Sequence, residues 1–245
     1  MFIKFMKKQN SKVLNLFIKL ISIILLIMAT LFLTGFEIQI RNISNWLGLI
    51  IFIIIFIVIV LILLVDFISH IKAKKIVKEK MKDNGIDYLI KTLKSGEYQE
   101  EVIEELGKSR DPRAVPALIE FVNSEEVKND EEGYKLEGGL NALAQTRDRK
   151  AIDFLISSLS NPELVVRFYV CSAIASQGIR DFRAVEPIIA LLKDIKDIKK
   201  RKDPLYDEMF ENWVIQALEV ITGKRFGNDH ERWEKWWEEN KQNYI

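Results

Sequence analysis

The chain has 245 residues and is 49% hydrophobic, so it is long enough for one or two domains with an apolar core. Its net charge of +1 hides an asymmetry: residues 1–83 carry 12 Lys+Arg against 4 Asp+Glu, which leaves 24 against 31, a net charge of −7, for residues 84–245. The acidic part argues against binding to nucleic-acid phosphates. The single cysteine, Cys171, excludes an intramolecular disulfide and a cysteine-based metal cluster.

Two apolar stretches follow a short basic segment, 1–12. The second stretch holds 20 uncharged residues from Trp46 to Val65, about the length that crosses a hydrocarbon core. We therefore predict transmembrane helices at 13–36 and 46–66, joined by a short external loop at 37–45, with the lipid bilayer as the partner of residues 13–66. A cleaved signal peptide is the alternative for the first stretch, but its apolar core is too long and its cleavage site is poor.

Positive charges lie on one side of this predicted hairpin. Five lysines precede the first uncharged core and six follow the second span in 67–83, whereas the loop contains only Arg41. The positive-inside rule then predicts a two-pass protein of the inner (plasma) membrane, with both termini and the repeat domain in the cytoplasm. We expect residues 67–83 to form a basic juxtamembrane helix. Its lysines either touch anionic headgroups or only fix the topology.

One sequence motif occurs three times in the acidic residues 84–245. Asp111, Asp148 and Asp181 open it, 37 and then 33 residues apart, and such an Asp is a preferred helix N-cap. Apolar residues at helical spacing follow in each copy and predict one buried stripe per helix: Val115, Leu118, Ile119, Val122; Ile152, Leu155, Ile156, Leu159; Val185, Ile188, Ile189, Leu192. A period of this length with helical patterning is typical of stacked helix pairs.

Each of these helices is followed by a predicted partner helix, over about 131–145, 162–177 and 206–222. Small residues on the first two partners predict close approach between helices: Gly138, Gly139, Ala142, Ala144, Ala173 and Ala175. The pair Asn84-Gly85 predicts a helix break. The charged segment 194–205 predicts a loop. No segment has strand periodicity, so residues 84–245 are predicted to be all-α.

Residues 161–192 resemble the HEAT repeat. The segment Asn161-Pro-Glu-Leu-Val-Val-Arg167 and the later Asp181-Phe-Arg-Ala-Val-Glu-Pro-Ile188 are similar to the HEAT-like form found in relatives of bilin lyases. In that form the second helix opens with Pro-x-x-Val-Arg and the next repeat opens with Asp-x-Arg-Ala-Val. The resemblance covers about 84–241, although the 131–145 helix lacks the Val-Arg pair. It implies a right-handed α-solenoid of HEAT/armadillo-like helix pairs at 84–226, closed by a Trp-rich capping helix at 227–245.

The resemblance also implies roles for particular residues. Second helices of HEAT pairs line a concave groove, and their polar residues away from the apolar stripe are candidates for contacting a protein or peptide partner: Tyr134, Glu137, Asn141, Ser172, Asn212 and Glu219. Arg167 matches the arginine of the Val-Arg pair, which in the family binds an aspartate of a neighbouring repeat. This implies a structural ladder of Asp111, Asp148, Arg167 and Asp181 rather than ligand contacts.

Two other segments have alternative interpretations. Trp233, Trp236 and Trp237 at helical spacing are either a cap over the apolar end of the stack or a recognition surface. The basic run 193–202 is either a solvated loop or a contact for lipid, RNA or an acidic partner. In both cases we favour the structural interpretation.

No catalytic constellation is present. His70 and His230 fall in unrelated segments, Cys171 lies among apolar neighbours, and the motifs of zinc proteases, phosphate loops and serine hydrolases are missing. We therefore predict no enzyme, cofactor or metal site. The leading hypothesis is a membrane-anchored HEAT scaffold or adaptor for protein–protein interaction. The alternatives are a lyase-like or glycosylase-like HEAT enzyme or subunit, and a structural membrane protein whose hairpin is the active part.

Overall fold

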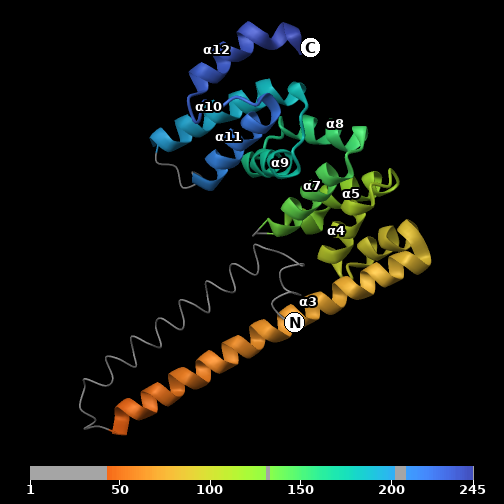
Figure 1. Cartoon of the computed structure of the whole chain (residues 1–245), viewed down its shortest axis with the longest axis vertical. Coiled ribbons are helices and arrows are strands. Elements are labelled where there is room, and N and C mark those ends of the chain that lie inside the picture. The colour runs from red at the N-terminus through yellow and green to blue at the C-terminus, as the bar shows by residue number, and fades with distance from the viewer. Residues whose placement is uncertain (1–42, 131–132, 202–207, 245) are drawn as a thin grey trace. The chain divides into compact units, whose positions relative to one another are not determined.

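The computed structural model describes residues 43–130, 133–201 and 208–244 (Figure 1). It divides the chain into two compact units, Met1–Asp66 and Phe67–Ile245. The described residues form helices joined by turns and short irregular segments, and no strand occurs among them, which confirms the all-α prediction for this part of the chain. The predicted basic segment 1–12 and the predicted first span 13–36 lie outside the described residues.

The described part of the first unit is helical and apolar. Helix α3, Ile43–Ser95, begins here, so the last three residues of the predicted loop 37–45 are helical. One helix in the described ranges, Ile53–Ser95, is long and apolar enough to cross a membrane by length and composition. Ile62 and Val65 on it are 62% and 67% exposed. Moving an exposed isoleucine or valine side chain from water into an apolar environment is favourable by about 1.5–3 kcal/mol. The segment is therefore more stable in apolar surroundings than in water.

The second unit begins before the predicted boundary at residue 84. Val77 is only 1% exposed and belongs to the hydrophobic core, and Ala73 is also buried. Lys74 Nζ lies 2.6 Å from Glu104 Oε2. The predicted break occurs at Gly85, whose φ of 70° interrupts α3 before the first short repeat helix. Residues 67–83 therefore belong to the second compact unit, against whose core Val77 packs.

The remainder of the second unit is a succession of helix pairs (Figure 1). The helices are α4 (Gln99–Ser109), α5 (Ala114–Val122), α6 (Glu125–Lys128), α7 (Tyr134–Thr146), α8 (Arg149–Ser158), α9 (Leu164–Gln177), α10 (Val185–Arg201), α11 (Glu208–Thr222) and α12 (His230–Asn240). In each pair a first helix packs on a second: α5 on α7, α8 on α9, and α10 on α11. The second helices also pack on one another in the order α4, α7, α9, α11. We call these four the second-helix row.

The predicted apolar stripes form the core. All twelve residues of the three stripes are buried or partly buried against it, which confirms the helical spacing. The largest fully buried side chains come from successive pairs, so one core runs through the unit: Leu89, Leu106, Leu118, Leu140, Leu143, Leu155, Ile174, Ile188, Leu191, Leu192, Leu218 and Trp233.

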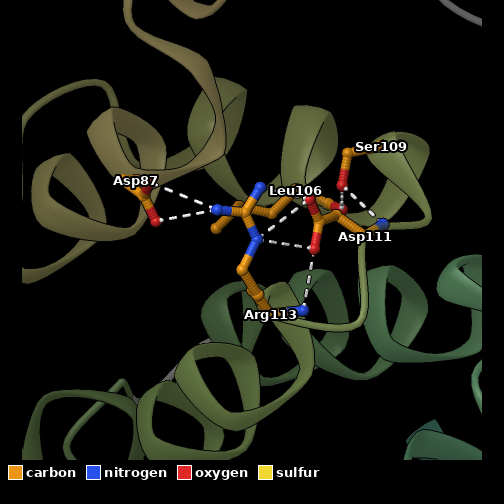
Figure 2. Close-up of polar contacts among 5 residues, drawn as sticks. All are labelled: Asp87, Leu106, Ser109, Asp111 and Arg113. Atoms are coloured by element: carbon orange, nitrogen blue, oxygen red, sulfur yellow. Dashed lines mark hydrogen bonds and ion pairs between the residues drawn. The ribbon is translucent and has the colours of Figure 1, made fainter.

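The repeat-opening aspartates fix the turns between pairs. Figure 2 shows Asp111 accepting from the backbone N–H of Arg113 at 2.9 Å, while its own N–H donates to Ser109 Oγ at 3.2 Å. Asp148 and Asp181 accept in the same way from the N–H two residues later, at 2.8 and 3.1 Å. Helix α5 itself starts three residues after Asp111, so that aspartate caps the preceding turn.

Two arginines bridge one pair to the one before it. The Arg113 guanidinium lies between Asp111, 2.7 Å away, and Asp87 of the preceding first helix, 3.2 Å away (Figure 2). Arg183 repeats this with Asp181 and Asp153, at 2.6 and 2.8 Å. The hydrogen bond from Arg183 lowers the pKa of Asp181, and that from Arg113 lowers the pKa of Asp111.

The bridge is interrupted in the middle of the stack. The residue that corresponds to Asp87 and Asp153 in the intervening repeat is Pro116, and the following repeat has Lys150 where the others have arginine. Lys150 forms no ion pair with the residues that the structure describes. An arginine follows the turn only in the repeats whose preceding repeat supplies an aspartate at the matching position. This fits an arginine that binds two carboxylates at once.

Arg167 does not join the predicted ladder. Its Nη1 lies 3.1 Å from Asp194 Oδ2 on α10, and not against Asp111, Asp148 or Asp181. The ladder is carried instead by Arg113 and Arg183, because these arginines directly follow the turn-forming aspartates. The physical role stays as expected, since Arg167 connects α9 to a neighbouring first helix.

The predicted loop 194–205 is helical up to Arg201. Ile195 and Ile198 on this part of α10 are buried at 2% and 4% exposure, since they continue the spacing of Ile188 and Leu191. These two isoleucines are each flanked by charged residues, so the apolar spacing is difficult to recognise in the sequence. Lys196 contacts α12 through His230 Nδ1 at 3.2 Å, so part of the basic run holds the C-terminal helix.

The C-terminal helix α12 packs on α10 with its tryptophans turned inward. Trp233 and Trp237 are buried, and Trp236 is half-buried against Phe226 and Tyr244. The Trp233 indole N–H donates to Gly227 O at 2.9 Å. These contacts fit a cap over the apolar end of the helix pairs.

Candidate partner-binding surface

The second-helix row presents one accessible stripe per helix. On α7 this stripe contains Tyr134, Glu137, Gly138 and Asn141, which are three or four residues apart. On α11 it contains Asn212 and Glu219. Five of the six residues predicted to contact a partner are therefore at least partly accessible. Tyr134 stands out, because a tyrosine that is 66% exposed covers no core and still presents a large apolar face.

Ser172 is a correction to the predicted surface. Its side chain is buried at 8% exposure, so a partner lying on α9 does not reach it. Asn141 on α7, another residue predicted to contact a partner, accepts a hydrogen bond from Ser176 Oγ on α9 at 2.9 Å and so links the two helices. The polar residues of α9 thus serve helix packing more than recognition, because α9 lies between α7 and α11 in the row.

An aromatic cluster at the centre of the row was not predicted. Tyr169 on α9 lies 5.6 Å from Trp213 and 6.5 Å from Phe210 between ring centroids, and Phe210 stacks on Phe168 at 4.5 Å. A Cβ on Gly133 would come within 2.7 Å of Tyr169 Oη, so the tyrosine also reaches the start of α7. Tyr169 therefore connects the start of α7 with α11. Phe168 and Tyr169 are buried within the chain, so the cluster packs α9 against α11.

Acidic side chains dominate the row. The four helices carry eight acidic and three basic residues. These are Glu100, Glu101, Glu104, Glu105, Glu137, Glu208, Glu211 and Glu219 against Lys108, Lys135 and Arg167. The α4 acids have basic neighbours, such as Lys74 beside Glu104, but Glu137 and Glu219 form no ion pair with any described residue. The accessible part of α7 and α11 is consequently negative.

Burial and these charges act together on Tyr169. Desolvation raises the pKa of Tyr169, and the negative charges of Glu137 and Asp130 raise it further. Both carboxylates are therefore close enough to sense the phenol. The same arrangement of an aromatic face beside carboxylates is suited to a cationic group, since ring quadrupole and carboxylate attract it together.

The nucleophilic and basic side chains do not converge. Cys171 is fully buried, and burial raises the pKa of its thiol, which disfavours a reactive thiolate there. His70 lies 3.0 Å from Glu101 on α4, whereas His230 contacts Lys196 on α10. Within the described ranges, no three His, Cys, Asp or Glu side chains form a group that could hold a metal ion.

The comparisons with known proteins agree with the helix pairs. The family model described as PBS lyase HEAT-like repeat matches residues 99–124. This stretch spans α4 and α5, the second helix of one pair and the first helix of the next, together with the turn at Asp111. No curated protein matches the chain. The matched stretch supports a HEAT-repeat protein, whose helix pairs suggest a scaffold for protein interaction.

Proposed function

We propose that this chain is a membrane-anchored HEAT-repeat scaffold that holds another protein on its second-helix row. The main support is the accessible face of that row, which presents the exposed Tyr134 together with Glu137 and Glu219, two carboxylates that form no ion pair with any described residue. In this proposal the pairs form a right-handed solenoid and the row lines its concave side. The role is non-catalytic, in keeping with a buried Cys171 and two separated histidines.

Charge reversal on the row tests the binding role. Tagged full-length chain is used to capture its partner from detergent extracts of membranes. We expect Glu137→Lys combined with Glu219→Lys to lower the yield about tenfold, because each reversal turns attraction into repulsion at an interface. The matched control is Glu234→Lys combined with Glu239→Lys, which changes net charge equally at exposed sites on α12. Equal loss, or no loss, in both double variants contradicts the assignment of the row.

We propose that residues 13–66 form a two-helix hairpin in the inner membrane, with both termini and the repeat unit in the cytoplasm. Support comes from the exposed isoleucines and valines of α3 and from lysines on one flank of the apolar stretches. A reporter enzyme fused after Ile245 is expected to be active only from the cytoplasmic side. A signal from the other side of the membrane would overturn this placement.

A further inference from the structure

A hollow of about 190 Å³ opens beside the aromatic cluster, between the loop that carries α6 and the start of α9. Its apolar wall comes from α5, α7, α8 and α9: Val122, Leu136, Phe154, Val165 and Val166. Asp130, Glu163 and Asn161 contribute polar groups, and Tyr169 lines it too. The hollow and the second-helix row therefore share Leu136 of α7 and three residues of α9, Val165, Val166 and Tyr169.

The volume fits one side chain. Sites for small molecules and cofactors usually enclose about 300–1,000 Å³, well above this hollow. A single long side chain from a partner is the occupant of matching size. Because the hollow adjoins the row, a segment lying on α7 and α9 can place one of its side chains there.

The charges at the hollow favour a cation. Asp130 and Glu163 bring two carboxylates, and one oxygen of Asp130 also accepts from the backbone N–H of Lys135 at 2.7 Å. The single lysine in the lining, Lys128, has its Nζ 2.7 Å from Glu125 Oε1 and also interacts electrostatically with Glu163. The lining thus carries two carboxylates against one lysine that Glu125 already pairs, so its charge is negative, as is the accessible face of α7.

We propose that this hollow receives an arginine side chain of the partner, an inference that rests on the proposed function. An arginine stem suits the valine and leucine wall, and its planar guanidinium packs on aromatic faces such as those of Phe154 and Tyr169. Its planar fork of five donors can bind a carboxylate of Asp130 or Glu163 through two parallel hydrogen bonds, which the compact charge of a lysine cannot do. The hollow thus specifies one basic residue within the segment that the row holds.

Selection of phage-displayed random nonapeptides on the full chain in detergent tests this inference. We expect the selected peptides to be enriched in arginine at one position. For one enriched peptide, replacing that arginine with norleucine is expected to raise Kd about tenfold or more, and lysine to recover only part of the loss. The double variant Asp130→Asn with Glu163→Gln is expected to raise Kd for the arginine peptide by a similar factor. It keeps an acceptor for the α7 backbone and leaves the norleucine peptide unaffected.

Glu234→Gln combined with Glu239→Gln is the matched control, because it removes the same number of charges at exposed sites on α12, and it should leave Kd unchanged. Peptides selected without arginine overturn the inference but leave the proposed function standing, as does an arginine preference that survives in the double variant. If no peptide is enriched, the inference fails, and the capture experiment above decides separately whether the row binds a protein.

Discussion

Replacing Gly138 with tryptophan is expected to lower partner capture more than tenfold while the chain remains folded. Gly138 lies one turn after Tyr134 on the accessible stripe of α7, and a Cβ built there meets nothing within 4 Å. A tryptophan is therefore accommodated at its Cβ without a clash in the free protein. It occupies the surface that a bound segment needs, and a loss of about 1.4 kcal/mol in binding already corresponds to tenfold.

The neighbouring glycine gives the contrast. A Cβ on Gly139 would lie 2.6 Å from Val122 Cγ2, so Gly139→Ala is expected to destabilise the fold by about 1–3 kcal/mol through overpacking. Gly138→Ala is expected to stabilise it by about 0.5–1 kcal/mol, because glycine is a poor residue inside a helix. The small-residue prediction was thus right for Gly139 and wrong for Gly138.

The three variants are compared by thermal unfolding, followed by circular dichroism, and by capture yield. Gly138→Ala is the control for the position itself and should capture the partner as the natural chain does. If Gly138→Trp captures as much partner as Gly138→Ala, then the α7 stripe is not the contact surface. A loss of stability in Gly138→Trp comparable to that of Gly139→Ala would show that position 138 is packed.

Trp233→Ala is expected to cost about 3–5 kcal/mol of unfolding free energy, the range for removing a large aromatic side chain from a core. Trp233 is completely buried, packs edge-on to Phe226 with ring centroids 4.7 Å apart, and donates to Gly227 O. Domains are stable by only about 5–15 kcal/mol, so the loss is a large fraction of the total. We expect α12 to detach first, since an end unit has neighbours on one side only.

Denaturant unfolding and limited proteolysis measure this loss. Trp236→Ala is the matched control, because Trp236 is the same residue type on the same helix but is only half-buried. Trp233→Phe removes the hydrogen bond and leaves a smaller ring in the same site, so its loss of stability should lie between that of Trp236→Ala and that of Trp233→Ala. A cost for Trp233→Ala no larger than for Trp236→Ala would contradict the capping role.

The helical spacing made most of the repeat unit predictable. Stripe residues such as Leu118 and Ile188 are buried because apolar side chains three or four residues apart share one face of a helix. The same rule failed on α10 after residue 193, where isolated isoleucines stand among lysines and aspartates and the charge dominates the local average. It also missed the burial of Val77 for that reason, and so did not indicate that residues 67–83 belong to the second compact unit.

The candidate surface was less predictable, because accessibility depends on neighbouring helices. Ser172 is polar and lies away from the apolar stripe of its own helix, yet packing in the middle of the row buries it. Tyr169 was overlooked since it follows Phe168 within an apolar run, and only the fold brings it against Trp213 and Gly133. The hollow could not be predicted either, because its lining comes from five segments of the chain.

Photo-crosslinking from the second-helix row tests the central claim most directly. A benzoylphenylalanine at position 134 replaces an exposed tyrosine on α7, and the same residue at position 190 replaces an exposed alanine on the first helix α10. We predict that irradiation of intact membranes joins one cytoplasmic protein to the chain from position 134 and not from position 190. Crosslinking from position 190 alone would contradict the binding of a partner on the second-helix row.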